Sequence, residues 1–156
     1  MDASFINSFI QGAQNVLTTV CKETPSLGKV FVKKTPYVAM PITITLSITG
    51  QLSGEVVYNM NESDAIFIAS AMMMGMPVAS LDAIAQSAVS EATNMISGNV
   101  ATLFYNKKIQ IDITPPRFKL NAGPEDFPLT SKVEKVVCVP LHFTSGECLE
   151  IDIVLP

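Results

Sequence analysis

Residues 133–155, VEKVVCVPLHFTSGECLEIDIVL, decide the fold class, because odd-numbered apolar residues recur in two runs on either side of a turn. They are Val133, Val137, Val139, Leu141 and Phe143 before the turn and Leu149, Ile151, Ile153 and Leu155 after it. Side chains that face each other across a hairpin lie on one side of the sheet, so equal parity requires a loop with an odd number of residues. Thr144-Ser145-Gly146 meets this requirement, and Gly146 can supply the left-handed turn residue. We predict an antiparallel hairpin with one apolar face.

The upstream sequence predicts further strands. In PITITLSITG, residues 41–50, isoleucine and leucine alternate with threonine and serine, which is the period of a half-buried strand. LSGEVVYNM, residues 52–60, follows the glycine that ends this strand and predicts the second arm of a hairpin. Short strands are predicted at 29–34 and within 107–118, the latter closed by a Pro-Pro pair and followed by a loop at 121–128.

Apolar residues at helical spacing predict three helices, at 4–21, 62–75 and 81–105. Asn61 is expected to cap the second helix and Ser80 the third, which is the longest. Strand groups that alternate with helices, together with one-sided hairpins, indicate an α+β protein in which long helices pack on one face of a largely antiparallel sheet. The length predicts a single domain over residues 1–156.

The composition argues against two classes of partner. With 48% hydrophobic and 15% charged residues, a net charge of −4 and no basic stripe, the chain is expected to fold around a core and to bind no nucleic acid. The longest apolar run, AIFIASAMMMGMPVA at 65–79, is shorter than the roughly 20 residues needed to span a bilayer, so no membrane partner is expected. The methionines at 72–76 are expected to pack in the core or in an interface.

The thiols and the single imidazole favour no metal centre. Cys21, Cys138 and Cys148 form no C-x-x-C pair, which favours reduced thiols in a cytoplasmic protein over a disulfide framework. His142 is the only histidine, and we expect it on a strand surface or as a hydrogen-bonded polar group. We therefore expect no metal site built from this chain alone.

The long predicted helix has two unlike faces, since each residue turns the helix by about 100°. The apolar face comprises Ala85, Ala88, Val89, Ala92, Met95, Ile96, Val100 and Leu103. The narrow opposite face carries Ser87, Glu91, Asn94 and Gly98, which are small or polar. Glu91 and Asn94 are three residues apart, so their side chains emerge side by side and can contact the same small object. This spacing by itself is also that of an ordinary solvated face.

Residues 87–102 follow the pattern S-x-x-x-E-x-x-N-M-x-x-G-N-x-A-T, which resembles the signature helix of the CheC/CheX/FliY family of chemotaxis phosphatases. The resemblance continues in ITGQLSGEVVY at 48–58, SAMMMGM at 70–76 and DITPP at 112–116, and so covers nearly the whole chain. The short single-domain layout is most like that of CheX.

The resemblance implies a CheC-like fold and a phosphatase that removes the phosphoryl group from the aspartyl phosphate of a CheY-like response regulator. Asn94 would orient the attacking water, and Glu91 would pair with the active-site lysine of the regulator. Ser87 and Gly98 would lie against this partner. The regulator would supply Mg²⁺, and the chain would need no cofactor of its own. By the same resemblance we expect a homodimer in which the sheets of two subunits join at an exposed edge.

Three positions depart from the family pattern. Some members carry a second motif on the first helix, and Ser8-x-x-x-Gly12-x-x-Asn15 has its spacing, but Gly12 stands where the acid would be, so no second site is expected. Thr93 replaces a glycine that is common in relatives and should point about 100° away from Asn94. Ser87 occupies a position where relatives often have aspartate.

The alternative from another class is a catalytically silent binding domain, as in flagellar switch proteins that share this fold. The discriminating feature is the pair itself, since a scaffold needs neither Glu91 nor Asn94.

Overall fold

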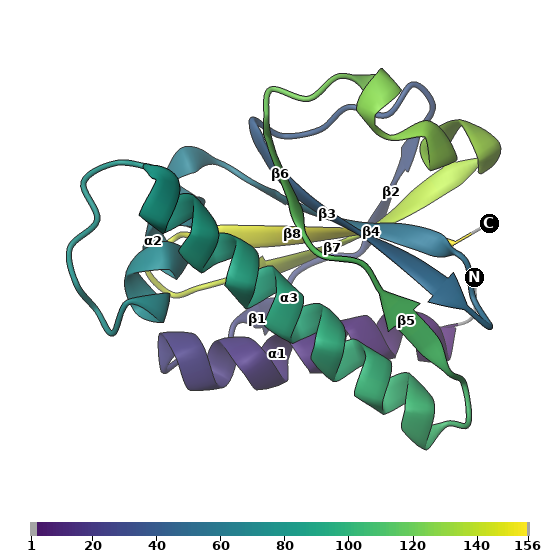
Figure 1. The fold of residues 1–156 in the computed structure, drawn as a ribbon, viewed down its shortest axis with the longest axis horizontal. Coiled ribbons are helices and arrows are strands. Elements are labelled where there is room, and N and C mark those ends of the chain that lie inside the picture. Colours follow the sequence, from purple (N-terminus) through teal and green to yellow (C-terminus); the bar gives the residue numbers. More distant parts are fainter. Residues whose placement is uncertain (1–2, 156) are drawn as a thin grey trace.

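The computed structural model describes residues 3–155, which form an eight-stranded antiparallel sheet and three α-helices (Figure 1). The helices are α1 Ala3–Cys21, α2 Glu62–Met72 and α3 Ala83–Asn106. The strands are β1 Ser26–Leu27, β2 Phe31–Lys34, β3 Ile42–Gly50, β4 Gly54–Met60, β5 Ile111–Ile113, β6 Arg117–Leu120, β7 Lys135–His142 and β8 Cys148–Val154. Their order is β1-β7-β8-β4-β3-β5, with β2 also paired to β7 and β6 to β3. The predicted α+β class is confirmed.

The C-terminal hairpin has the predicted register. Val137 faces Ile153 and Leu141 faces Leu149 across β7 and β8. Residues 144–146 form the loop, which the Phe143 amide closes by donating to the Glu147 carbonyl at 2.9 Å. Gly146 has φ 104°, the left-handed conformation expected of the turn glycine.

The three helices cover one face of this sheet, and α3 crosses the strands diagonally (Figure 1). The main core lies between the helices and the sheet. The residues that α3 contributes to it are Val89, Ala92, Ile96, Val100 and Phe104. Phe104 packs edge-on against both Phe5 and Phe9 of α1, with ring centroids 5.4 and 5.9 Å apart. The sheet therefore acts as a rigid support on which α3 is held along most of its length.

The opposite face of the sheet is covered as well, which the sequence did not predict. Residues 117–132 fold back over it: β6 pairs with β3, and the 3₁₀ turns η1 Pro124–Asp126 and η2 Pro128–Lys132 follow (Figure 1). Phe127 from this segment packs against Tyr37 in a second, smaller cluster. Thr43 of β3, expected at a solvated surface, is 1% exposed for this reason. The prediction of a half-buried strand at 41–50 was wrong. The short strand that closes before the Pro-Pro pair is confirmed as β5, whereas the pairing of β6 after the prolines was not predicted.

The starts of α2 and α3 differ in how well the sequence predicted them. The Asn61 amide donates to the Asp64 carboxylate at 2.8 Å at the start of α2, as expected of a capping residue with acidic groups in the first turn. At α3 the cap is Asp82, whose Oδ1 accepts from the Ala85 amide at 2.9 Å, so the choice of Ser80 was wrong. Both are good capping residues, and sequence alone could not rank them.

The methionine cluster lies at the end of α2 and only part of it is core. Met72 packs against the main core, whereas Met74 and Met76 are 96% and 60% exposed. Within residues 3–155 no helix has both the length and the apolar character needed to cross a membrane.

Candidate functional site

The orientation of α3 determines which side chains are presented to the outside. Its buried residues are Ala85, Val89, Ala92, Thr93, Ile96, Ser97, Val100 and Phe104. Compared with the predicted apolar face, the buried face of α3 is therefore rotated: it includes Thr93 and Ser97, which are 2% and 1% exposed, and leaves out Met95, which is 39% exposed. The prediction that Met95 is core was wrong.

Local hydrogen bonds explain how two hydroxyl residues can occupy the core face of α3. Thr93 Oγ1 donates to the Ser90 carbonyl at 2.7 Å, and Ser97 Oγ pairs with the Tyr58 hydroxyl of β4 at 2.8 Å. Burial raises the pKa of the Tyr58 phenol far above its ordinary value. The Tyr58–Ser97 pair therefore stays neutral and fixes the rotation of α3 on the sheet.

The predicted polar face is exposed in full. Ser87, Glu91, Asn94 and Gly98 all lie at the outer surface of α3, and we call these four residues the α3 ridge. Among residues 3–155, neither the Glu91 carboxylate nor the Asn94 carboxamide has a hydrogen-bonding partner. Both groups are free to bind something outside this chain.

The α3 ridge is held on a close-packed pair of helices. A Cβ built on Gly12 of α1 would lie 2.6 Å from Val100 Cγ2 and 3.2 Å from the Val100 amide nitrogen, so the two helices touch through backbone at this point. Asn15 Nδ2 donates to Asn99 Oδ1 at 3.2 Å one turn further along. Because the contact leaves no room for a side chain at position 12, the glycine in the second motif is a packing residue.

The other residues of that second motif are also engaged. Ser8 is 2% exposed, and its hydroxyl accepts from Lys107 Nζ at 2.9 Å. Asn15 is tied to α3 as described. The three residues therefore pack α1 against α3 instead of forming an exposed acid–amide pair.

The chemistry available on the α3 ridge is limited to one carboxylate, one carboxamide and one hydroxyl. A carboxamide can donate to and accept from the same water molecule, and a carboxylate can pair with a lysine. Neither is a strong nucleophile or base. The ridge is suited to completing the active site of another protein that brings its own reactive group.

A second polar cluster lies on the opposite face of the sheet. Asp152 is fully buried, and its Oδ2 accepts from Asn59 Nδ2 at 3.0 Å, from Lys33 Nζ at 3.1 Å and from the Tyr37 hydroxyl. Lys33 also binds Glu150 Oε2 at 2.6 Å. Burial, and then the neighbouring Asp152 charge, raise the pKa of Glu150 to about 7.

The same cluster contains three possible metal ligands, since single donor atoms of Cys138, Glu150 and Asp152 lie within 4.8 Å of one another. The ammonium group of Lys33, however, already lies at hydrogen-bond distance from both carboxylates, in the place a cation would take. Burial raises the pKa of the Cys138 thiol well above its ordinary range, which further disfavours a thiolate ligand. We interpret the cluster as structural. Sequence analysis missed it, although acids at two even-numbered positions of the last strand were a signal.

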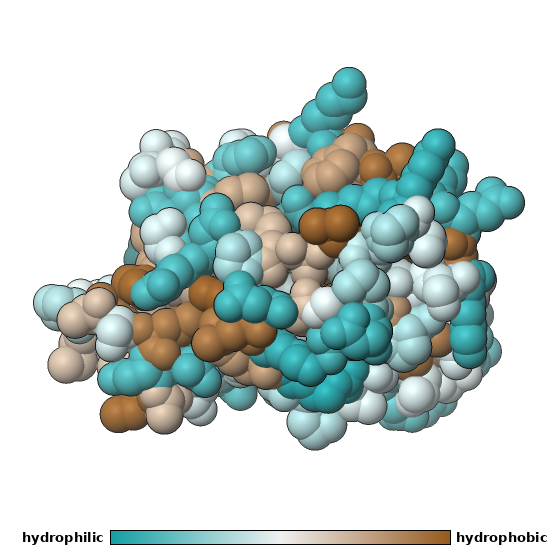
Figure 2. Space-filling model, turned by 90° about the horizontal axis from the view of Figure 1, so that it is seen from above, coloured by the Kyte–Doolittle hydropathy of each residue, from teal (hydrophilic) through white to brown (hydrophobic). Residues whose placement is uncertain are grey.

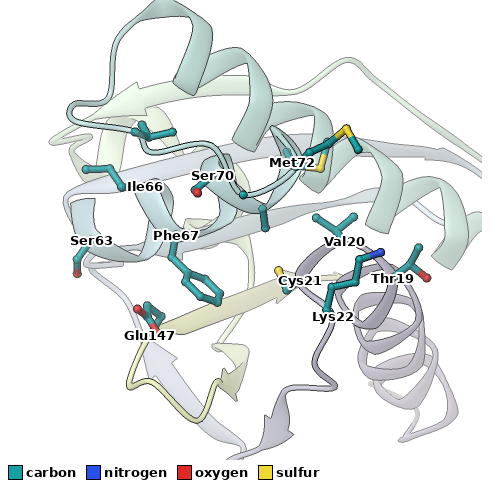
Figure 3. Close-up of a pocket in the computed structure, with 14 residues that line it drawn as sticks. Thr19, Val20, Cys21, Lys22, Ser63, Ile66, Phe67, Ser70, Met72 and Glu147 are labelled. Carbon is teal, nitrogen blue, oxygen red and sulfur yellow. The ribbon is translucent and has the colours of Figure 1, made fainter.

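An apolar groove of about 790 Å³ lies apart from the ridge, between the end of α1 and α2 (Figure 3). Val20 and Cys21 line it from α1, and Phe67 and Met72 from α2. None of the four ridge residues contributes to its wall.

His142, at the end of β7, is exposed, as expected of a strand surface residue.

A helix-covered antiparallel sheet whose longest helix presents an exposed glutamate and asparagine defines an α+β domain of the CheC-like class. The chain belongs to the CheX family, since the family model described as chemotaxis phosphatase CheX matches residues 42–142. The resemblance seen in the sequence is thereby confirmed.

Individual relatives agree with this assignment. The chain is 31% identical over 116 residues to the CheY-P phosphatase CheX of Thermotoga maritima, and the aligned region covers 74% of this chain and 75% of that protein. The crystal structure of the chemotaxis protein CheX from Desulfovibrio desulfuricans superposes with a TM-score of 0.79 at 22% identity, over 98% of this chain and 99% of that one. CheX from Borrelia burgdorferi, solved in a complex with CheY, BeF3 and Mg²⁺, gives a TM-score of 0.78 at 23% identity over 97% of both chains.

Proposed function

We propose that this chain is a phosphatase that hydrolyses the aspartyl phosphate of a CheY-like response regulator. The observation that carries the proposal is the free, exposed Glu91–Asn94 pair on the rigid α3 ridge. Two comparisons support it: the relative from Thermotoga maritima is a CheY-P phosphatase, and the CheX of Borrelia burgdorferi was solved with CheY, BeF3 and Mg²⁺.

In the proposed reaction Asn94 acts on the attacking water. Its carboxamide oxygen accepts a hydrogen bond from the water while its NH₂ group donates one, and this aligns the water oxygen behind phosphorus. The water oxygen bonds to phosphorus as the bond from phosphorus to the aspartyl oxygen breaks, which yields inorganic phosphate and the free aspartate, and the water proton leaves with the phosphate. An acyl phosphate is already activated, so the step needs positioning and charge stabilisation more than a strong base.

Glu91 has the proposed role of a docking residue. Its carboxylate would pair with the active-site lysine of the regulator and so fix how far Asn94 reaches into the phosphorylated pocket. Ser87 and Gly98 would lie against the regulator on either side of the pair. Mg²⁺ would be bound by the acidic pocket of the regulator, and this chain would contribute no metal ligand.

The test follows phosphate release from a phosphorylated CheY-like regulator in the presence of Mg²⁺. The wild-type chain should accelerate release well beyond the regulator's own rate, and Asn94→Ala should abolish most of that acceleration. Asn106→Ala is the matched control, because Asn106 is an exposed asparagine on the same helix, twelve residues further on and off the ridge. If the wild-type chain does not accelerate phosphate release, the catalytically silent binding domain is the better interpretation.

We also propose that two copies join at the sheet edge formed by β1 and β2. Both strands pair with β7 alone among residues 3–155, so their outer edges are unpaired. Leu27, Phe31 and Val32 are 45%, 38% and 46% exposed along this edge. A second copy would pair the free backbone groups and cover these side chains.

Since Cys21, Cys138 and Cys148 are free thiols and the proposed partner is an intracellular regulator, we place the chain in the cytoplasm.

A further inference from the structure

Two large apolar side chains flank the α3 ridge. Ile84 is 66% exposed and Met95 is 39% exposed. On an α-helix both project within about 60° of the direction of Glu91, one about two turns before it and the other one turn after it. Isolated exposed apolar residues are common, so it is their position beside the acid–amide pair that calls for an explanation. Apolar side chains also gather at the end of the molecule that carries α2 and the connection to α3 (Figure 2).

The whole of α3 is depleted in charge. Its sequence AIAQSAVSEATNMISGNVATLFYN contains 24 residues, of which Glu91 alone is an Asp, Glu, Lys or Arg. A solvated helix normally carries several charges on its outer face, whereas depletion of charge is typical of the core of a protein interface. The outer surface of α3 thus costs little to remove from water, apart from the single carboxylate.

Gly98 provides a separate observation. A Cβ built on it would meet nothing within 4 Å, in contrast to Gly12, where it would collide with α3. Glycine is a poor residue for the interior of a helix, and the fold of this chain gains nothing from it at position 98. The open space above Gly98 lets the backbone of a partner approach α3 closely.

We infer that Ile84 and Met95 are apolar anchors, and Gly98 a clearance position, of the surface on which the receiver domain of the response regulator docks. This inference rests on the proposed function. The regulator is favoured over other occupants by charge: covering an apolar surface that holds one carboxylate leaves Glu91 buried and unpaired unless the partner brings a cation to it. The regulator's active-site lysine, which the family resemblance implies as the partner of Glu91, meets that need.

The anchors should set the affinity of docking and leave the chemical step unchanged. We expect Ile84→Ser and Met95→Ser each to weaken binding to the regulator in its BeF₃⁻–Mg²⁺ form by about tenfold, the effect typical of a truncated interface anchor. In dephosphorylation assays KM should rise by a similar factor, whereas kcat should stay within about twofold of wild type. Val38→Ser is the control, because Val38 is 70% exposed and follows Tyr37 on the opposite face of the sheet.

Gly98→Leu tests the clearance position separately. Leucine is a good helix former and has open space here, so the variant should fold at least as stably as wild type while its binding to the regulator falls about tenfold or more. Normal binding by this variant would show that no partner approaches α3 at Gly98.

The outcomes separate this inference from the proposed function. If the wild-type chain speeds phosphate release and Asn94→Ala does not, but Ile84→Ser and Met95→Ser bind the regulator as tightly as wild type, only the assignment of the anchors is overturned. If these two variants change the sedimentation of the chain on its own and leave regulator binding intact, the surface joins two copies of this chain. No phosphate release by the wild-type chain would remove the basis of both proposals.

Discussion

At the residue scale, Asn94 and Glu91 are both exposed and have no hydrogen-bonding partner among residues 3–155, although the helix that carries them is otherwise closely packed. Helical periodicity could predict their shared face, because side chains three apart on a helix always emerge together. It could not predict Thr93 and Ser97 as core, since their burial depends on a carbonyl one turn back and on Tyr58 of a distant strand. The roles of Glu91 and Asn94 came from resemblance, and spacing alone would have left them on a solvated face.

A prediction at this scale concerns Glu150, which faces Lys33, Asp152 and Cys138. Its pKa is raised from 4.5 to about 7, so the folded chain holds a proton that the unfolded chain has lost at intermediate pH. The stabilisation from Glu150 is therefore fully present below the pKa of the unfolded chain, and it is lost as the pH rises through the pKa of the folded chain. We expect the free energy of unfolding in urea to fall between about pH 5 and pH 8, and the fall to be smaller in Glu150→Gln.

The matched control for this experiment is Glu134→Gln, which removes an exposed acid just before β7 and should keep the wild-type pH dependence. Identical pH dependence in the wild type and in Glu150→Gln would mean that the buried cluster does not hold the extra proton.

At the scale of elements, the contact between α1 and α3 determines where the ridge points. The helices touch at Gly12, and the tie between Asn15 and Asn99 adds a polar contact at the surface. Spacing could not separate this packing glycine from a motif position that has lost its acid. Hairpin parity together with the turn residues, in contrast, predicted the β7–β8 register correctly, because only a loop with an odd number of residues keeps both apolar runs on one face and residues 144–146 provide such a loop. β6 was missed because its pairing with β3 follows two prolines that normally end a strand.

The two glycines of the helix pair give a prediction with opposite signs. Gly12→Ala places a methyl group 2.6 Å from Val100 Cγ2 and should lower the free energy of unfolding, by the about 1–3 kcal/mol typical of an overpacked core. Gly98→Ala meets open space and should raise it, by the about 0.5–1 kcal/mol that separates alanine from glycine in a helix. Urea titrations of both variants measure the difference. A change of the same sign in both would contradict the packing described for α1 and α3.

At the scale of the whole molecule, the sheet has two edges, one formed by β1 and β2 and the other by β5 and β6. The proposed dimer uses only the first edge, so a substitution at each edge tests it. Val32→Lys should convert the dimer to a monomer, because a lysine on an edge strand opposes pairing with a second sheet. Leu120→Lys is the control: Leu120 is 54% exposed on β6, at the other edge, and its change should leave the mass unchanged. Light scattering after size exclusion gives the mass, and a wild-type chain that elutes as a monomer at high concentration would rule out the dimer.

In the proposed phosphatase Asn94 acts on the attacking water, whereas the rest of the α3 ridge binds the regulator, and one experiment separates these two roles. The rate of phosphoryl loss from the regulator is measured at saturating chain in a single turnover, beside the affinity for the BeF₃⁻–Mg²⁺ form of the same regulator. For Asn94→Ala we predict a rate at least about 100-fold below wild type, as for the loss of a group that positions a reactant, with an affinity within about threefold. A variant that binds as weakly as it reacts, or that reacts as fast as wild type, would contradict a role for Asn94 in orienting the water.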